Sequence, residues 1–197
     1  VPASLSYLSA GDTHLKKWSA RLQEIPQPRV AVAWSGNPAH DNDRNRSLPF
    51  SALAPLFPPA NPPSLAEGRV GAAPSFISIQ RDLRSEDAAR LAAETRLTHL
   101  GGELDDFSDT AAVLALCDLV ISVDTAPVHL AGAMGRPVWV LVPFAPDWRW
   151  TLDGEITPWY PTARLFRQDL FRQDSPSDWN AVMARVAAAL KLFGLQK

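Results

Sequence analysis

The sequence predicts an α/β protein in which helices cover both faces of a parallel β-sheet. Short apolar runs rich in β-branched residues alternate with stretches of helical spacing, the order that parallel sheets require. The runs are apolar throughout, as expected for strands buried on both faces. The clearest unit is residues 119–142, where apolar runs at 119–123 and 138–142 flank a helix of small residues.

The length of 197 residues fits one well-packed domain with an appendage. We expect residues 1–28 to be a lead-in or interdomain linker and residues 29–197 to be the domain. The net charge of −2 argues against a nucleic-acid partner. No stretch approaches the ~20 apolar residues of a membrane-spanning helix. The start lacks the basic-then-apolar order of a signal peptide, so we expect a cytoplasmic protein.

The first half of the chain contains the following predicted elements. Residues 14–22 form a short helix with Leu15, Trp18 and Leu22 on one face, and the prolines at 26 and 28 end it. Residues 29–36 form a strand ending in glycine, followed by a polar loop to residue 47 and a helix at 50–57. The proline-rich residues 58–63 are loop. A second strand spans 75–80, and Ser85 caps the next helix.

The second half continues the alternation around the central unit. A short strand at 98–101 precedes a helix at 110–116 that Ser108 or Asp109 caps. Cys117, the only cysteine, lies in an apolar run and is expected to be buried. The last strand spans 163–168, and Ser177 caps a closing helix whose apolar stripe contains Trp179, Val182, Met183, Val186 and Leu190.

Polar and glycine-rich residues follow the predicted strands, at the edge where parallel sheets bind ligands. They are Gly36 and Asn37, Gln80, Gly101 and Gly102, Asp124 and Thr125, and residues 143–150. The loop at 37–47 adds Arg44 and Arg46, whose guanidinium groups match phosphate oxygens. A solvated loop would explain these arginines equally well if they stood alone. Their convergence on one edge favours a nucleotide or sugar-phosphate site.

The turn after residue 123 is the strongest candidate for that site. Asp124 and Thr125 can cap the helix and Pro127 fits its first turn, so free amides and the helix dipole form an anion site. His129, one turn further on, would add a donor. This fragment alone equally allows Asp124 and Thr125 to be simple caps and His129 a satisfied surface histidine.

Five segments together carry a family resemblance: residues 32–40, residues 45–49, Ile79-Gln80, residues 121–133 with Asp124-Thr-Ala-Pro-Val-His129, and residues 144–150. They resemble the C-terminal half of bacterial glycosyltransferases related to the ADP-heptose heptosyltransferases, most closely the version attached to tetratricopeptide repeats. The resemblance covers residues 29 to about 168. It implies a Rossmann-like domain, the C-terminal half of a GT-B fold, which holds the nucleotide-sugar donor.

The resemblance also implies roles for individual residues. Asp124, Thr125 and Ala126 would hold the donor's phosphates and sugar, and His129 would contact a phosphate. Ala126 replaces the more usual glycine but keeps its backbone amide. Arg46 stands where heptosyltransferases carry a lysine and would neutralise the pyrophosphate. The predicted donor phosphate and sugar site consists of Gly36, Asn37, Arg46, Gln80, Asp124, Thr125, Ala126 and His129.

Two further groups border that site. Asp106, Phe107 and Thr110 lie where such domains meet the base or ribose. Asp147, Trp148, Arg149 and Trp150 are either a lid over the sugar or acceptor or a packed tryptophan cluster. No metal is implied, because the Asp-x-Asp spacing at residues 41–43 falls in a polar loop. We expect no cofactor besides the donor substrate.

Glycosyl transfer requires positive charge for the departing nucleotide and a base for the acceptor hydroxyl. The resemblance places that base in an N-terminal domain, so we expect a donor-binding half. Its partners would be a nucleotide sugar, a glycan or protein acceptor, and an upstream acceptor domain, with tetratricopeptide repeats as one candidate. Two alternatives remain: a nucleotide-sugar epimerase or hydrolase on the same fold, and a noncatalytic binding or scaffold module.

Overall fold

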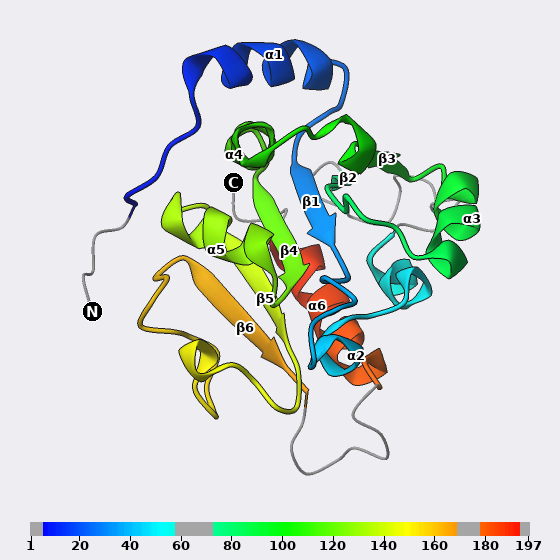
Figure 1. Ribbon diagram of the computed structural model, residues 1–197, viewed down its shortest axis with the longest axis vertical. Helices are drawn as coiled ribbons and strands as arrows, with labels where there is room; N and C mark the ends of the chain where they lie inside the picture. Colours follow the sequence, from blue (N-terminus) through cyan, green and yellow to red (C-terminus); the bar gives the residue numbers. More distant parts are fainter. Residues whose placement is uncertain (1–5, 58–72, 169–177, 194–197) are drawn as a thin grey trace.

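The computed structural model describes residues 6–57, 73–168 and 178–193. Its centre is a six-stranded sheet in the order β3-β2-β1-β4-β5-β6, with every neighbouring pair parallel (Figure 1). The predicted parallel α/β fold is therefore confirmed. The strands are β1 (Arg29–Ala33), β2 (Ser75–Ser78), β3 (Leu97–His99), β4 (Leu119–Val123), β5 (Val138–Val142) and β6 (Ala163–Arg167).

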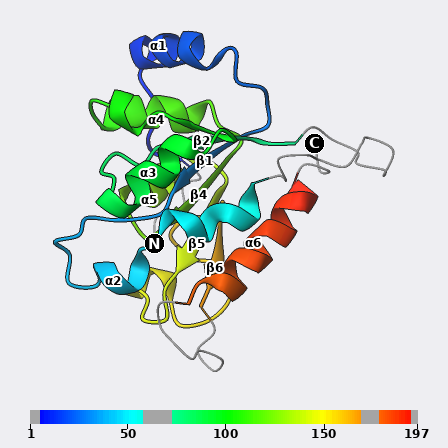
Figure 2. The ribbon, with the colours of Figure 1, turned by 90° about the vertical axis from the view of Figure 1, so that its right-hand side faces the viewer.

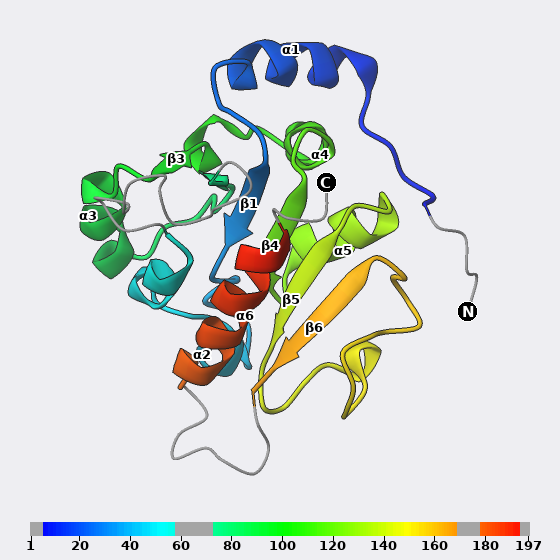
Figure 3. The ribbon, with the colours of Figure 1, turned by 180° about the vertical axis from the view of Figure 1, so that it is seen from behind.

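Helices cover both faces of the sheet, as Figures 2 and 3 show. One face carries α1 (Asp12–Leu22), α4 (Phe107–Ala115) and α5 (Ala126–Ala133). The other carries α6 (Asn180–Phe193) and the 3₁₀ helix η1 (Phe50–Leu56), with α3 (Ser85–Ala93) beside η1. Shorter turns are α2 (Asp43–Arg46), η2 (Gly101–Glu103) and η3 (Trp148–Trp150).

Two apolar cores form because successive side chains of a strand point to opposite faces. In β1, Ala31 and Ala33 belong to the core under α1, α4 and α5. Val30 and Val32 belong to the core under α6 and η1. Strands β1, β4 and β5 are thus buried from both sides, which explains their unbroken apolar sequences.

Several predicted boundaries differ from the structure. The helix expected at 50–57 is a 3₁₀ helix that contains Pro55, whose missing N–H disfavours a regular α-helix. The loop at 37–47 contains the short helix α2. The N-cap of α3 is Arg84, and Ser85 is the first helical residue. The expected loop at 58–63 and the cap at Ser177 lie outside the described residues.

The N-cap of α4 is Asp106, so the prediction of Ser108 or Asp109 was wrong. The Asp106 carboxylate accepts hydrogen bonds from the amides of Ser108 at 2.7 Å and Asp109 at 3.0 Å. The helix consequently begins at Phe107. Asp109 is buried and makes other contacts, which are described below.

The predicted helix in the first 28 residues is confirmed as α1, and it packs against α4 (Figure 1). Trp18 and Leu22 are buried in the core on that face, while Leu15 packs against it. In the described ranges, no helix is long and apolar enough to cross a membrane.

Candidate functional site

The chain adds strands on one side of β1 and then on the other: β2 and β3 lie to one side, and β4, β5 and β6 lie to the other. The strand order therefore switches between β1 and β4. Sheets of this kind bind ligands in the crevice at that point, beyond the carboxyl ends of the strands. A pocket of about 570 Å³ lies there. The predicted site residues that line it are Gly36, Asn37, Arg46, Gln80, Asp106, Phe107, Thr110, Thr125 and Ala126. The tertiary structure thus brings most of the residues of the two predicted groups into one cavity.

Arg46 crosses from the β1 loop to the end of β4. Its Nη1 donates to the backbone oxygen of Asp124 at 2.9 Å. Its Nε is buried and has no hydrogen-bond partner among the residues that the structure describes. Within the same residues, no carboxylate lies within ion-pair distance of the guanidinium. A cation with unused donors therefore lines the pocket.

Gly36 provides the space for this guanidinium. A Cβ at this position would lie 2.7 Å from Arg46 Nη2 and 3.0 Å from Thr125 Cγ2. The glycine is thus needed because a side chain passes over it closely.

A buried relay holds the loop that carries Arg46. The amide of Gly36 donates to Ser47 Oγ at 2.9 Å, and this hydroxyl donates to Asp43 Oδ1 at 2.6 Å. The other oxygen of Asp43 accepts from Arg84. Because Asp43 is buried, this charged contact is shielded from water and ties α2 to the segment before α3.

Gln80 shapes the pocket without a free group for a ligand. Its Oε1 accepts from the amides of Trp34 at 3.0 Å and Ser35 at 3.1 Å. Its Nε2 donates to the backbone oxygens of Ser35 at 3.0 Å and Asp82 at 3.1 Å. These contacts use both donors and both lone pairs of the amide. Gln80 was predicted as a ligand contact, and the structure uses it to join the ends of β1 and β2.

The amino end of α5 faces the pocket through Thr125, Ala126 and Pro127. Thr125 is the N-cap residue but makes no side-chain cap, because its hydroxyl donates back to the oxygen of Val123 at 3.3 Å. Pro127 has no N–H, and the Val128 amide donates to the Thr125 oxygen at 3.1 Å. The Ala126 amide and the helix dipole therefore remain available to an anion.

Asp124 and His129 do not line the pocket. His129 Nε2 lies 3.5 Å from Asp124 Oδ1, and its Nδ1 lies 3.1 Å from the Tyr160 hydroxyl. Its ring stacks on Trp150, with centroids 5.4 Å apart. Burial raises the pKa of Asp124, but His129, Trp150 and Arg46 nearby together outweigh burial, and the net pKa is below the usual value. Direct contact between His129 and phosphate stays a prediction.

The residues of the proposed lid lie in different environments. Trp150 is 0% exposed and belongs to the core, which agrees with the packed alternative for this residue. Trp148 is 64% exposed and meets Trp159 edge to face at 5.2 Å. The guanidinium of Arg149 lies 4.6 Å from the Trp148 ring centroid and pairs with Asp147 at 2.9 Å. This exposed group lies outside the pocket lining.

The rim predicted to meet base or ribose does border the pocket. Phe107 is 63% exposed, which leaves its ring free to stack. The Asp106 carboxylate is engaged in capping α4, and its bonds from the amides of Asp109 and Ser108 lower its pKa. Thr110 Oγ1 donates to the oxygen of Asp106 at 3.1 Å.

The pocket also contains residues that the sequence analysis missed. These are Ser35, Arg81, Asp82 and Asp105, among others. Arg81 and Asp82 directly follow the strand-end residue Gln80, so extending each strand end by two residues would have found them. Asp105 precedes the cap of α4 and had no comparable signal.

The sheet order and the pocket at its switch point define a Rossmann-like α/β domain. Residues 75–166, from β2 to β6, match the family model described as glycosyltransferase family 9 (heptosyltransferase). This match supports the assignment of the domain to a glycosyltransferase. It covers β4, α5 and β5, and includes the residues at the amino end of α5 that line the pocket.

Solved structures show the same fold. The chain aligns with Escherichia coli ADP-heptose LPS heptosyltransferase II at a TM-score of 0.56 and 17% identity, over 98% of this chain and 56% of that one. It aligns with a family 9 glycosyl transferase of Veillonella parvula DSM 2008 at a TM-score of 0.60 and 14% identity, over 97% and 54%. The described domain is therefore the Rossmann-like type found in these glycosyltransferases.

Among curated proteins, the chain is similar to Protein FlbA of Caulobacter vibrioides, with 28% identity over 203 residues. The alignment covers 98% of this chain and 30% of that protein. The chain thus spans under a third of this curated relative and about half of the two solved glycosyltransferases.

Proposed function

We propose that this chain is the donor-binding unit of a glycosyltransferase and that its pocket holds the nucleoside diphosphate of a nucleotide sugar. The observation that carries the proposal is the guanidinium of Arg46. It lines the pocket with no described carboxylate within ion-pair distance and with a hydrogen bond to the Asp124 backbone oxygen, beside the amino end of α5, whose N-cap side chain makes no capping bond. Both groups bind phosphate oxygens well.

The pyrophosphate would lie between Arg46 and α5. Arg46 and the end of β4 are 78 residues apart in sequence, yet they are joined by the hydrogen bond to Asp124. The two positive groups therefore act on the same small volume. As the sugar is transferred, negative charge grows on the departing diphosphate, and groups already oriented toward it stabilise that charge without reorganising.

The nucleoside would extend toward the α4 rim. Phe107 offers an exposed ring for stacking, and the carboxylates of Asp82 and Asp105 can accept hydrogen bonds from sugar hydroxyls. The cavity volume lies within the range typical of small-molecule sites. The same pocket thus offers separate environments for the charged and the nucleoside parts of a donor.

The acceptor side is part of the proposal. A glycan or protein hydroxyl would attack the donor, deprotonated by a carboxylate of an upstream acceptor domain, with tetratricopeptide repeats as a candidate neighbour. In this arrangement the chain supplies donor binding and charge stabilisation. The donor is its substrate, and the positive charge comes from Arg46 and α5 without a metal or cofactor.

Calorimetric titration with ADP, UDP and GDP tests the proposal. Arg46→Gln should raise the Kd of the bound nucleotide, because a charge-assisted hydrogen bond of about 1.5 to 3 kcal/mol is lost. Arg44→Gln is the matched control, since it removes the same charge from an exposed position in the same turn. Equal affinities for wild type and Arg46→Gln would refute the phosphate site.

A further inference from the structure

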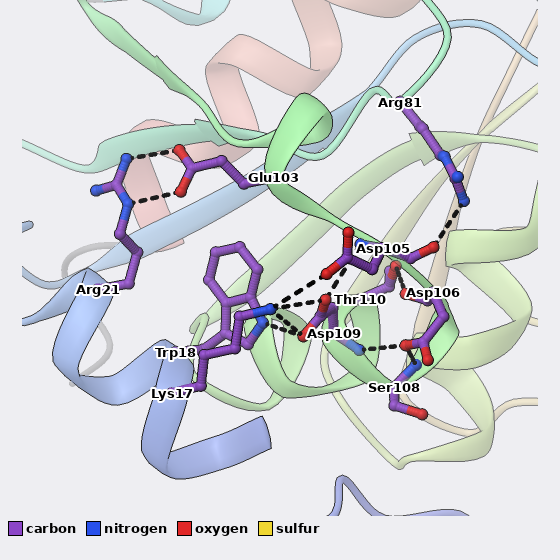
Figure 4. Close-up of polar contacts among 10 residues, drawn as sticks. All are labelled: Lys17, Trp18, Arg21, Arg81, Glu103, Asp105, Asp106, Ser108, Asp109 and Thr110. Atoms are coloured by element: carbon purple, nitrogen blue, oxygen red, sulfur yellow. Dashed lines mark hydrogen bonds and ion pairs between the residues drawn. The ribbon is translucent and has the colours of Figure 1, made fainter. Parts of the chain in front are cut away.

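The first helix is connected to the pocket through a buried carboxylate on α4 (Figure 4). Lys17 Nζ donates to both oxygens of Asp109 at 3.0 Å, and Trp18 Nε1 donates to Oδ1 at 2.7 Å. Asp109 is only 2% exposed. Two neighbouring residues of α1 therefore compensate a charge that burial would otherwise make costly.

The same carboxylate holds the backbone of the pocket rim. Asp109 Oδ2 accepts a hydrogen bond from the amide of Asp105 at 3.1 Å. The oxygen of Asp105 accepts from Arg81 Nη1 at 3.2 Å, and Lys17 lies 3.6 Å from the Asp105 carboxylate. Asp106 then caps α4. The rim is thus attached on one side to the end of β2 and on the other to α1.

We propose that Asp109, held by Lys17 and Trp18, is a positioning residue that sets the rim at residues 105–107 for the nucleoside part of the ligand. This inference rests on the proposed function of the pocket. It makes α1 a part of the ligand-binding unit, although α1 ends at Leu22, far from the rim in sequence.

The contacts of the rim explain why it needs this support. The side chain of Asp105 is 87% exposed, and Phe107 is 63% exposed. Neither side chain is held by apolar packing, so the backbone hydrogen bonds must define their positions. Asp109 can hold the Asp105 amide only while its own orientation is fixed, and Lys17 and Trp18 fix it from the opposite side.

Two substitutions separate positioning from a direct charge effect. Lys17→Met removes the ammonium group, whereas Trp18→Phe removes the N–H donor and part of the ring volume but leaves the net charge unchanged. Lys17→Arg restores a cationic donor. Lys16→Met is the matched control for charge on the same helix, and Lys16 is exposed. Arg21→Gln is the control for α1 docking, because Arg21 pairs with Glu103 at 2.7 Å and does not contact the rim.

The binding assay compares a nucleoside diphosphate with inorganic pyrophosphate, which reaches only the Arg46 end. Lys17→Met and Trp18→Phe should each raise the nucleoside diphosphate Kd about three- to tenfold, the effect expected when one hydrogen bond is weakened. The pyrophosphate Kd should stay at the wild-type value. Lys17→Arg, Lys16→Met and Arg21→Gln should bind both ligands like wild type. Equal losses for both ligands, or no loss for either, would overturn the inference.

Amide hydrogen exchange without ligand gives an independent readout. In Lys17→Met and Trp18→Phe, the amide of Asp105 should exchange faster, while amides in β4 keep their wild-type protection. Unchanged exchange at Asp105 would overturn the inference. If the wild-type chain binds no nucleoside diphosphate, the proposed function fails, and the exchange result alone then decides whether α1 positions the rim.

Discussion

Replacing Gly36 by alanine should weaken nucleoside diphosphate binding and leave the fold intact. The added Cβ would lie 2.7 Å from Arg46 Nη2 and 3.1 Å from Arg46 Cζ. These atoms are the end of a flexible side chain, so the guanidinium should move and the backbone should stay. The movement would remove the spare donors from the phosphate position.

The size of the effect follows from the contact that is lost. Displacement breaks the 2.9 Å bond between Arg46 Nη1 and the Asp124 oxygen and withdraws a cationic donor from the ligand. A hydrogen bond to a charged group contributes about 1.5 to 3 kcal/mol, equivalent to a roughly 10- to 150-fold increase in Kd. Alanine also lowers the entropy of the unfolded chain, a gain of about 0.4 to 1 kcal/mol that offsets the local crowding. The melting temperature should therefore change little.

Calorimetry on Gly36→Ala, Arg46→Gln and the double variant tests the mechanism. If alanine acts through Arg46, the double variant should bind no more weakly than Arg46→Gln alone, because both changes remove the same interaction. Wild-type affinity in Gly36→Ala would refute the reasoning. Additive losses in the double variant would refute it as well.

Three further predictions concern stability and reactivity. Gly101→Ala should lower the free energy of unfolding by about 1 to 3 kcal/mol, since its Cβ would lie 1.8 Å from the backbone oxygen of Gln80. Gly102→Ala should be near neutral in the same denaturant titration, because no atom lies within 4 Å of its Cβ. Burial raises the pKa of Cys117 to about 12, so a thiol reagent at pH 8 should label it only after unfolding; rapid labelling of the native chain would contradict this. Burial raises the pKa of Asp109, but its hydrogen bonds from Trp18 and Lys17 bring the net pKa below the ordinary value. The ionised carboxylate therefore stabilises the fold fully above about pH 4, and this stabilisation is lost as pH falls through the folded pKa. The stability difference between wild type and Asp109→Asn should shrink in acid, and a constant difference would be inconsistent with this linkage.

Much of the candidate site could be predicted from the sequence because parallel strands all end at one edge. Residues that follow β1, β2 and β4 must meet there, so Gly36, Arg46 and Thr125 could be grouped before their distances were known. The β-branched runs also located each of those strands to within a few residues. These are local properties, and local sequence is sufficient to define them.

The roles of individual polar side chains could not be predicted in the same way. Gln80 is a polar residue at a strand end, which is typical of a ligand contact. In the structure, however, the surrounding backbone amides and oxygens use all of its side-chain donors and acceptors. Trp148 and Trp150 are identical residues two positions apart. One is exposed and the other is stacked on His129, because burial depends on segments distant in sequence.

By itself, the sequence determined the class of fold, the strands and the edge at which the candidate site lies, because periodicity and strand polarity are carried by short segments. Only the tertiary structure decided that Asp106 caps α4, since Asp109 is taken by Trp18 and Lys17 of α1. It also decided that the Arg46 guanidinium lines the pocket and donates to the backbone oxygen of Asp124. Which neighbours satisfy a buried polar group depends on contacts between distant segments, and these exist only once the chain has folded.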